Sequence, residues 1–257
     1  HDLYRFFKLS VRRHEFRDIF KEKLDLHHIP ALSNVLYSED ILFPIADFYL
    51  KKERWNEAIE VYEEMETIGA LQGRGAEYYQ KLGYALQKNK KYAEAIDAYL
   101  KADTLKPDNI WNNRHLAICY RLNRNYQAAL SYYKKVEEAT PEDTNVIFHI
   151  GSCLAELGQY EEAANYFFKL DFIESNCIKA WRGIGWCSFI SRKYEQAMKY
   201  YEKIIEQKPL AIDYMNAGHV AWTMGDIQKA AALYGKSITA NGNRERFLEM
   251  FRKDEEA

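Results

Sequence analysis

The chain has 257 residues, and its 36 Lys and Arg nearly balance its 38 Asp and Glu. The net charge of −2 excludes the broad basic surface with which many proteins bind nucleic acid. No apolar run reaches the roughly 18 residues of a membrane-spanning helix, so we expect no transmembrane segment and no membrane partner.

The first residue is His1 rather than Met, and no signal-like segment follows it. We therefore expect a piece of a longer protein, with a cytoplasmic location. Residues 1–38 do not fit the pattern that follows, although Phe16, Ile19 and Phe20 indicate an amphipathic helix. We predict an N-terminal helical segment that covers the first repeat. The alternative is a degenerate earlier repeat.

From residue 39 to residue 244 a pattern of roughly 34 residues recurs six times. The six repeats span residues 39–72, 76–109, 110–143, 144–177, 178–210 and 211–244. Each repeat has an alanine at the same register, at Ala58, Ala95, Ala129, Ala163, Ala197 and Ala230. Four residues later each carries an aromatic ring, at Tyr62, Tyr99, Tyr133, Phe167, Tyr201 and Tyr234. This spacing places the alanine and the ring on one helix face.

The fifth repeat shows the full pattern in Trp181, Ile184, Gly185, Ala197, Tyr201 and Pro209. It resembles the tetratricopeptide repeat family. The resemblance implies an all-α fold, a right-handed superhelical solenoid of helix pairs, and assigns Trp181 to the core. Departures are local: the fifth repeat is one residue short, and Ser175 stands where the fourth would have its proline.

Residues 245–257 follow the last repeat and indicate one more helix, with Phe247, Met250 and Phe251 on its inner face. We predict a C-terminal capping helix, because a solenoid needs polar ends. The alternative is the first helix of a seventh repeat.

No sequence motif indicates a catalytic centre, a metal site or a cofactor. Cys119, Cys153 and Cys187 occupy one register in three successive repeats, which indicates small apolar core residues rather than ligands. We therefore predict a protein that is not an enzyme and needs no cofactor or metal.

In the resembled family the first helix of each repeat lines a concave groove, which carries the family's ligands. The family offsets select groove residues that combine exposed rings with cations, a composition typical of binding hot spots. They are Tyr84, Trp111, Arg114, Arg121, Phe148, Lys179, Arg182, Trp186, Phe189, His219 and Trp222. The offsets also select Met215. The alternative for the rings is that some pack between first helices as core.

These residues predict a protein-interaction scaffold for a protein or peptide segment with apolar anchors and some acidic residues. The family's carboxylate clamp for acidic C-terminal tails is not expected, since its five positions hold Arg114, Ile118, His149, Lys179 and Gly183 in repeats three to five. Two alternatives remain: a self-assembly module that forms a homodimer, and a substrate-recruiting domain of a larger enzyme or regulator.

Overall fold

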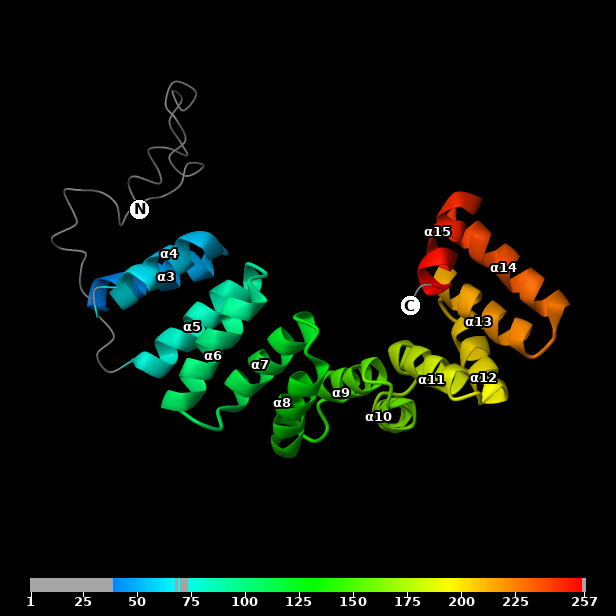
Figure 1. The fold of residues 1–257 in the computed structure, drawn as a ribbon, viewed down its shortest axis with the longest axis horizontal. Coiled ribbons are helices and arrows are strands. Elements are labelled where there is room, and N and C mark those ends of the chain that lie inside the picture. Colours follow the sequence, from blue (N-terminus) through cyan, green and yellow to red (C-terminus); the bar gives the residue numbers. More distant parts are fainter. Residues whose placement is uncertain (1–38, 68, 70–73, 256–257) are drawn as a thin grey trace, which may run out of the picture. The chain divides into compact units, whose positions relative to one another are not determined.

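A computed structural model describes residues 39–67, 69 and 74–255 of the chain, and the predicted segment 1–38 lies outside these residues. The described residues form thirteen helices and no strand, which confirms the all-α prediction (Figure 1). The described residues fall into two compact units, which meet in the sequence between Pro107 and Asp108.

The N-terminal unit contains two helix pairs. They are α3 (Glu39–Lys51) with α4 (Trp55–Thr67), and α5 (Gly75–Lys88) with α6 (Tyr92–Leu105).

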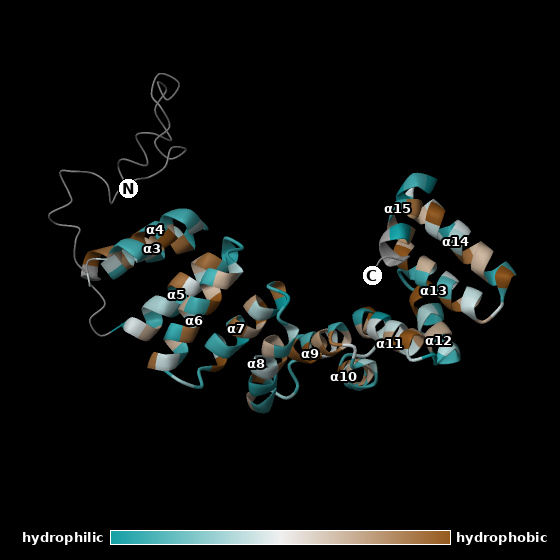
Figure 2. Ribbon diagram, in the orientation of Figure 1, coloured by the Kyte–Doolittle hydropathy of each residue, from teal (hydrophilic) through white to brown (hydrophobic). Residues whose placement is uncertain are grey.

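The C-terminal unit contains four helix pairs and a final helix. The pairs are α7 (Ile110–Leu122) with α8 (Tyr126–Ala139), α9 (Thr144–Glu156) with α10 (Tyr160–Ile173), α11 (Ile178–Ile190) with α12 (Tyr194–Ile205), and α13 (Ala211–Thr223) with α14 (Ile227–Asn241). The final helix is α15 (Arg244–Glu255). Polar and apolar positions alternate along each helix, so every helix has an apolar face to bury (Figure 2).

The core is a seam in which a ring of the second helix packs on a small residue of the first. The six recurring alanines are fully buried. A Cβ atom added to Gly151 would lie 2.9 Å from the ring of Phe167, and one added to Gly218 would lie 2.5 Å from the ring of Tyr234. Trp181 is 4% exposed, which confirms its assignment to the core, and its Nε1 donates to Asp171 Oδ1 at 2.6 Å.

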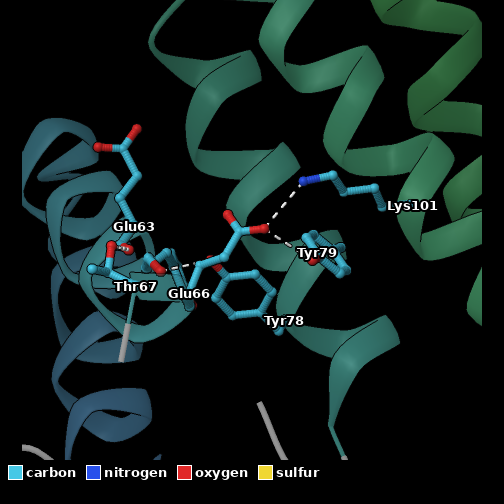
Figure 3. Close-up of polar contacts among 7 residues, drawn as sticks. Glu63, Glu66, Thr67, Tyr78, Tyr79 and Lys101 are labelled. Atoms are coloured by element: carbon cyan, nitrogen blue, oxygen red, sulfur yellow. Dashed lines mark hydrogen bonds and ion pairs between the residues drawn. The ribbon is translucent and has the colours of Figure 1, made fainter. Parts of the chain in front are cut away.

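Polar contacts, one buried and others exposed, join the two helix pairs of the N-terminal unit (Figure 3). The hydroxyl of Tyr78 donates to the carbonyl of Tyr62 at 2.6 Å, which ties α5 to α4. Glu66 of α4 accepts from the hydroxyl of Tyr79 and from Lys101 Nζ, both at 3.1 Å. The hydrogen bond to Glu66 raises the pKa of Lys101, so this ammonium stays charged and helps to hold three helices together.

The four cysteines are buried free thiols. Burial raises the pKa of Cys119 to about 12 and that of Cys187 to about 11, so these thiols stay protonated and unreactive at neutral pH. They act as the small apolar core residues that the sequence predicts.

Helix α15 lies against α14 and contributes rings to the last seam. Phe247 is buried, and its ring centroid lies 6.0 Å from that of Tyr234. Its role as an end cap, rather than the first helix of a further repeat, stays a prediction.

Each turn inside a helix pair contains one residue in the left-handed backbone region, two positions before the second helix. The six residues are Glu53, Lys90, Arg124, Gly158, Arg192 and Gly225. The next amide closes the turn by bonding back to the first helix, as Gln159 N does to Leu154 O at 2.9 Å and Lys193 N to Ser188 O at 2.8 Å.

Substitutions at this left-handed position are expected to change stability in opposite directions in two repeats. Gly158 has a φ of +76° and open space around its Cα, so Gly158→Ala is expected to destabilise the protein by about 1 kcal/mol through backbone strain alone. Arg192, one repeat later, has a φ of +60°, so Arg192→Gly is expected to stabilise by up to about 1 kcal/mol. Urea unfolding followed by circular dichroism measures both. Changes of the same sign would contradict the explanation.

Candidate functional site

A cavity of about 640 Å³ opens between the first helices of the C-terminal unit. Its walls come from α9, α11 and α13, with two rings from the α10 side. The lining residues are Phe148, Ser152, Ala155, Glu156, Tyr160, Phe167, Lys179, Arg182, Gly183, Trp186, Ile212, Asp213 and Asn216.

One wall of the cavity is formed where the ring of Phe167 packs on Gly183. A Cβ atom at this position would lie 2.5 Å from the ring of Phe167, so the ring rests directly on the backbone of α11. The same register holds His149 one repeat earlier. The ring of Phe148 stands 6.0 Å from that of Phe167, and Trp186 stands one turn along α11 from Arg182. The rings of Phe148, Phe167 and Trp186 therefore contribute to the walls of the cavity.

One wall of the cavity is a bidentate ion pair between α11 and α13. Arg182 donates from Nε to Asp213 Oδ1 and from Nη2 to Asp213 Oδ2, both at 2.7 Å. Asp213 is 1% exposed and also accepts from the backbone N–H of Leu210 at 2.7 Å. This hydrogen bonding raises the pKa of Arg182. The sequence predicted that the Arg182 guanidinium binds an acidic partner. In the structure both of these N–H donors are bound to Asp213 of the chain itself.

Two more of the predicted cations have internal partners. Arg114 Nη2 lies 2.7 Å from Asp143 Oδ2, and the same carboxylate caps α9 through the N–H of Val146. Lys179 Nζ lies 3.6 Å from Glu174 Oε2 and 5.8 Å from the ring centre of Phe148. Acidic residues at the start of a first helix therefore pair with arginines on the first helix of the preceding helix pair.

Arg121, Tyr133 and His149 form a cluster between α7, α8 and α9. The rings of Tyr133 and His149 stack with centroids 5.5 Å apart and planes at 25°. Burial, then the charges of Arg121 and Lys179, lowers the pKa of His149 to about 4, against the opposing charge of Asp143. Burial raises the pKa of Tyr133 to about 12, although the nearby Arg121 guanidinium opposes the shift. His149 is therefore neutral at pH 7.

The other predicted residues do not line this cavity. Phe189 packs against Trp186, with ring centroids 6.3 Å apart, and Trp222 is 59% exposed. His219 Nδ1 lies 3.0 Å from the hydroxyl of Tyr234, and Phe251 of α15 covers its ring at 5.1 Å.

Two predicted rings lie on first helices that precede the cavity in the chain. Trp111, at the start of α7, is exposed and packs on His115 with ring centroids 4.0 Å apart. Tyr84 belongs to the N-terminal unit, where its ring meets that of Trp55 at 6.0 Å. The family offsets also predicted that Met215 faces the groove. This prediction was wrong, because Met215 is fully buried.

Sequence reasoning therefore found Phe148, Lys179, Arg182 and Trp186 of the cavity and missed Gly183, Asp213 and Asn216 as lining residues. Asp213 could have been found from the sequence, because it is an acidic residue in the first turn of a predicted helix. Within the described part of the chain, no group of three or more His, Cys, Asp or Glu side chains could hold a metal ion. None of the described helices has the length and apolar character to cross a membrane.

Family profiles described as tetratricopeptide repeat match most of the chain, at residues 42–72, 76–109, 121–187, 178–209 and 214–244. The chain belongs to the tetratricopeptide repeat family. No curated protein matches it.

Solved structures of tetratricopeptide repeat proteins share its fold. A tetratricopeptide repeat protein from Parabacteroides merdae is 20% identical with a TM-score of 0.65, over 85% of this chain and 92% of that one. YrrB, described as a tetratricopeptide repeat protein with an unusual peptide-binding site, is 20% identical with a TM-score of 0.60, over 74% and 96%. MamA is 19% identical with a TM-score of 0.61, over 66% and 94%. At these identities the likeness shows the fold alone.

The ion pair predicts that Arg182 is structural. Arg182→Met leaves Asp213 buried without its cation and is expected to cost about 2–4 kcal/mol of unfolding free energy. Lys193→Met removes the exposed pair with Glu161, in which the side chains are 54% and 79% exposed, and should cost under about 1 kcal/mol. Urea unfolding of the two variants tests this, and equal small losses would contradict it.

The low pKa of His149 predicts an acid-sensitive fold. The unfolded chain binds a proton at His149 near its ordinary pKa of 6.5 and the folded chain near 4, so stability falls as the pH drops through that window. His149→Gln should therefore lose less stability than the natural protein between pH 7 and pH 4.5. Urea midpoints at the two pH values measure this. An equal loss in both proteins would show that His149 does not contribute.

Proposed function

We propose that this chain is a non-enzymatic protein-interaction scaffold, and that the groove of its C-terminal unit binds an extended peptide or partner segment. The cavity between α9, α11 and α13 carries the proposal. At about 640 Å³ it has room for apolar side chains of a ligand.

The chemistry of the cavity favours an apolar anchor. Phe148 and Trp186 offer ring faces, and aromatic residues dominate the binding energy of protein interfaces. The bidentate pair of Arg182 with Asp213 holds one wall in place before any ligand arrives. Because the cavity is already formed, binding does not cost the free energy of ordering the side chains that line it.

A polar atom in the same cavity favours a peptide over a purely apolar ligand. Asn216 Oδ1 is buried and accepts no hydrogen bond from the residues that the structure describes. A buried acceptor without a donor costs free energy, which an N–H group of a bound segment would recover. An extended backbone offers such donors at regular spacing. YrrB, of the same fold, is described as having a peptide-binding site, which agrees with this proposal.

Self-association is a second candidate, because the turn between α13 and α14 exposes three large apolar side chains. Trp222 is 59% exposed, Met224 45% and Ile227 51%. Exposed apolar residues close together mark protein contact surfaces. Light scattering over a hundredfold range of concentration separates a homodimer from a monomeric scaffold.

Selection from a phage-displayed library of random twelve-residue peptides tests the groove. Enriched peptides are expected to share an apolar or aromatic position. Trp186→Ala should weaken their binding by about tenfold or more, since it removes a wall of the cavity. Phe172→Ala is the matched control, because Phe172 is 89% exposed on α10 and does not line the cavity.

Circular dichroism confirms that both variants stay helical. A library that yields no common position, or peptides that bind Trp186→Ala as tightly as the natural protein, would refute the groove.

A further inference from the structure

We propose that Glu156, Tyr160 and Trp186 form a cation subsite at one end of the cavity, and that it binds a lysine or arginine side chain of the partner segment. This inference rests on the proposed function and specifies a charged residue that the segment carries beside its apolar anchor. The predicted cations of the groove, taken alone, indicate the opposite charge for the partner, so the contacts of each charged group decide the matter.

The three residues lie at the same end of the cavity, and all three line it. Glu156 is the last residue of α9 and Tyr160 the first of α10, so one short turn separates them. The other end is marked by Lys179, whose Nζ lies 5.8 Å from the ring centre of Phe148. At 1.5 Å of rise per helical residue, Glu156 lies about 12 Å along α9 from Phe148, and Trp186 about 10 Å along α11 from Lys179.

Glu156 is the carboxylate of the cavity that the chain leaves without a cation. Arg182 is bound to Asp213, and Lys179 Nζ lies 3.6 Å from a carboxylate oxygen at the end of α10. Among the residues that the structure describes, no Lys or Arg lies within ion-pair distance of Glu156. The hydroxyl of Tyr126 donates a hydrogen bond to Glu156, but this neutral group leaves the negative charge uncompensated.

The two rings of the subsite also lack a cation from the chain itself. No Lys or Arg of the described part of the chain stands over the ring of Tyr160 or Trp186, although such contacts are frequent on its other rings. Both rings are half-buried, so their faces are partly shielded from water. The face of an aromatic ring attracts a cation, most strongly for indole, and the attraction grows as the site is desolvated.

The N-terminal unit has its own cation at the equivalent place. Tyr84 occupies the register of Trp186 in its repeat, and Lys88 of the same helix places its Nζ 5.3 Å from the centre of the Tyr84 ring. In the repeat of Trp186 the register of Lys88 holds Ile190. The cation that the chain supplies to Tyr84 is therefore left to a ligand at Trp186.

A lysine or arginine side chain suits this arrangement. Its aliphatic stem can lie along the apolar wall of the cavity while its charged head reaches the exposed carboxylate of Glu156. An apolar side chain of the same segment still has the space beside Phe148 and Phe167. None of the three subsite residues occupies a register of the family's carboxylate clamp.

The experiment uses a peptide selected on the natural protein, synthesised with lysine and with acetyl-lysine at its basic position. Acetylation keeps the stem and removes the charge, so the lysine form is expected to bind about tenfold more tightly. Glu156→Gln should reduce this preference by about threefold, as for an exposed ion pair. Glu162→Gln is the matched control, since it removes a carboxylate of α10 that lies outside the cavity, and it should keep the preference.

Ile190→Lys tests the rings separately. It places an ammonium beside Trp186 as Lys88 does beside Tyr84, and it should abolish the preference for the lysine form. Ile190 is 37% exposed and does not line the cavity, so a lysine fits there, and circular dichroism checks that the variant stays helical. A preference that survives Ile190→Lys would contradict the role of the rings.

The subsite is wrong if the enriched peptides share no basic position, if the lysine and acetyl-lysine forms bind equally, or if Glu156→Gln and Glu162→Gln change the preference to the same extent. Each of these results leaves the apolar groove standing, as long as Trp186→Ala still weakens binding. A library without any enriched peptide would instead refute the proposed function, and this inference with it.

Discussion

The contact on which the structure depends is a ring of each second helix seated on a small residue of the first. Gly151 under Phe167 and Gly218 under Tyr234 leave no room for a methyl group. The contact sets how closely two helices approach, and therefore the spacing at which the next pair can stack. Because each pair buries its apolar face only against its neighbours, the same contact must recur in every repeat.

The groove contains a variation on this contact. At Gly183 the first helix lacks a side chain on its inner face as well, so the ring of Phe167 lies on the backbone of α11 and forms part of the cavity wall. One repeat earlier the same register holds His149, whose ring stacks on Tyr133. The residue at this register therefore decides whether the first helix receives a ring from the preceding repeat or presents an imidazole of its own.

The polar groups of the groove show how a repeat protein distributes charge. Asp143 and Asp213 stand near the starts of α9 and α13, where a helix favours negative charge, and each binds an arginine on the first helix of the preceding pair. These pairs link successive repeats and leave most of the groove without excess charge.

The sequence alone determined the helix pairs, the family and the buried seam, through the repeat spacing, the alanines and the rings. It could do so because this packing depends on residues three or four positions apart on one helix. The sequence could also name most of the rings in the groove. It could not tell that Arg182 faces Asp213, that Met215 turns inward or that Gly183 receives the ring of Phe167. Those features depend on contacts between residues about 30 positions apart on separate helices, and only the tertiary structure brings these residues together.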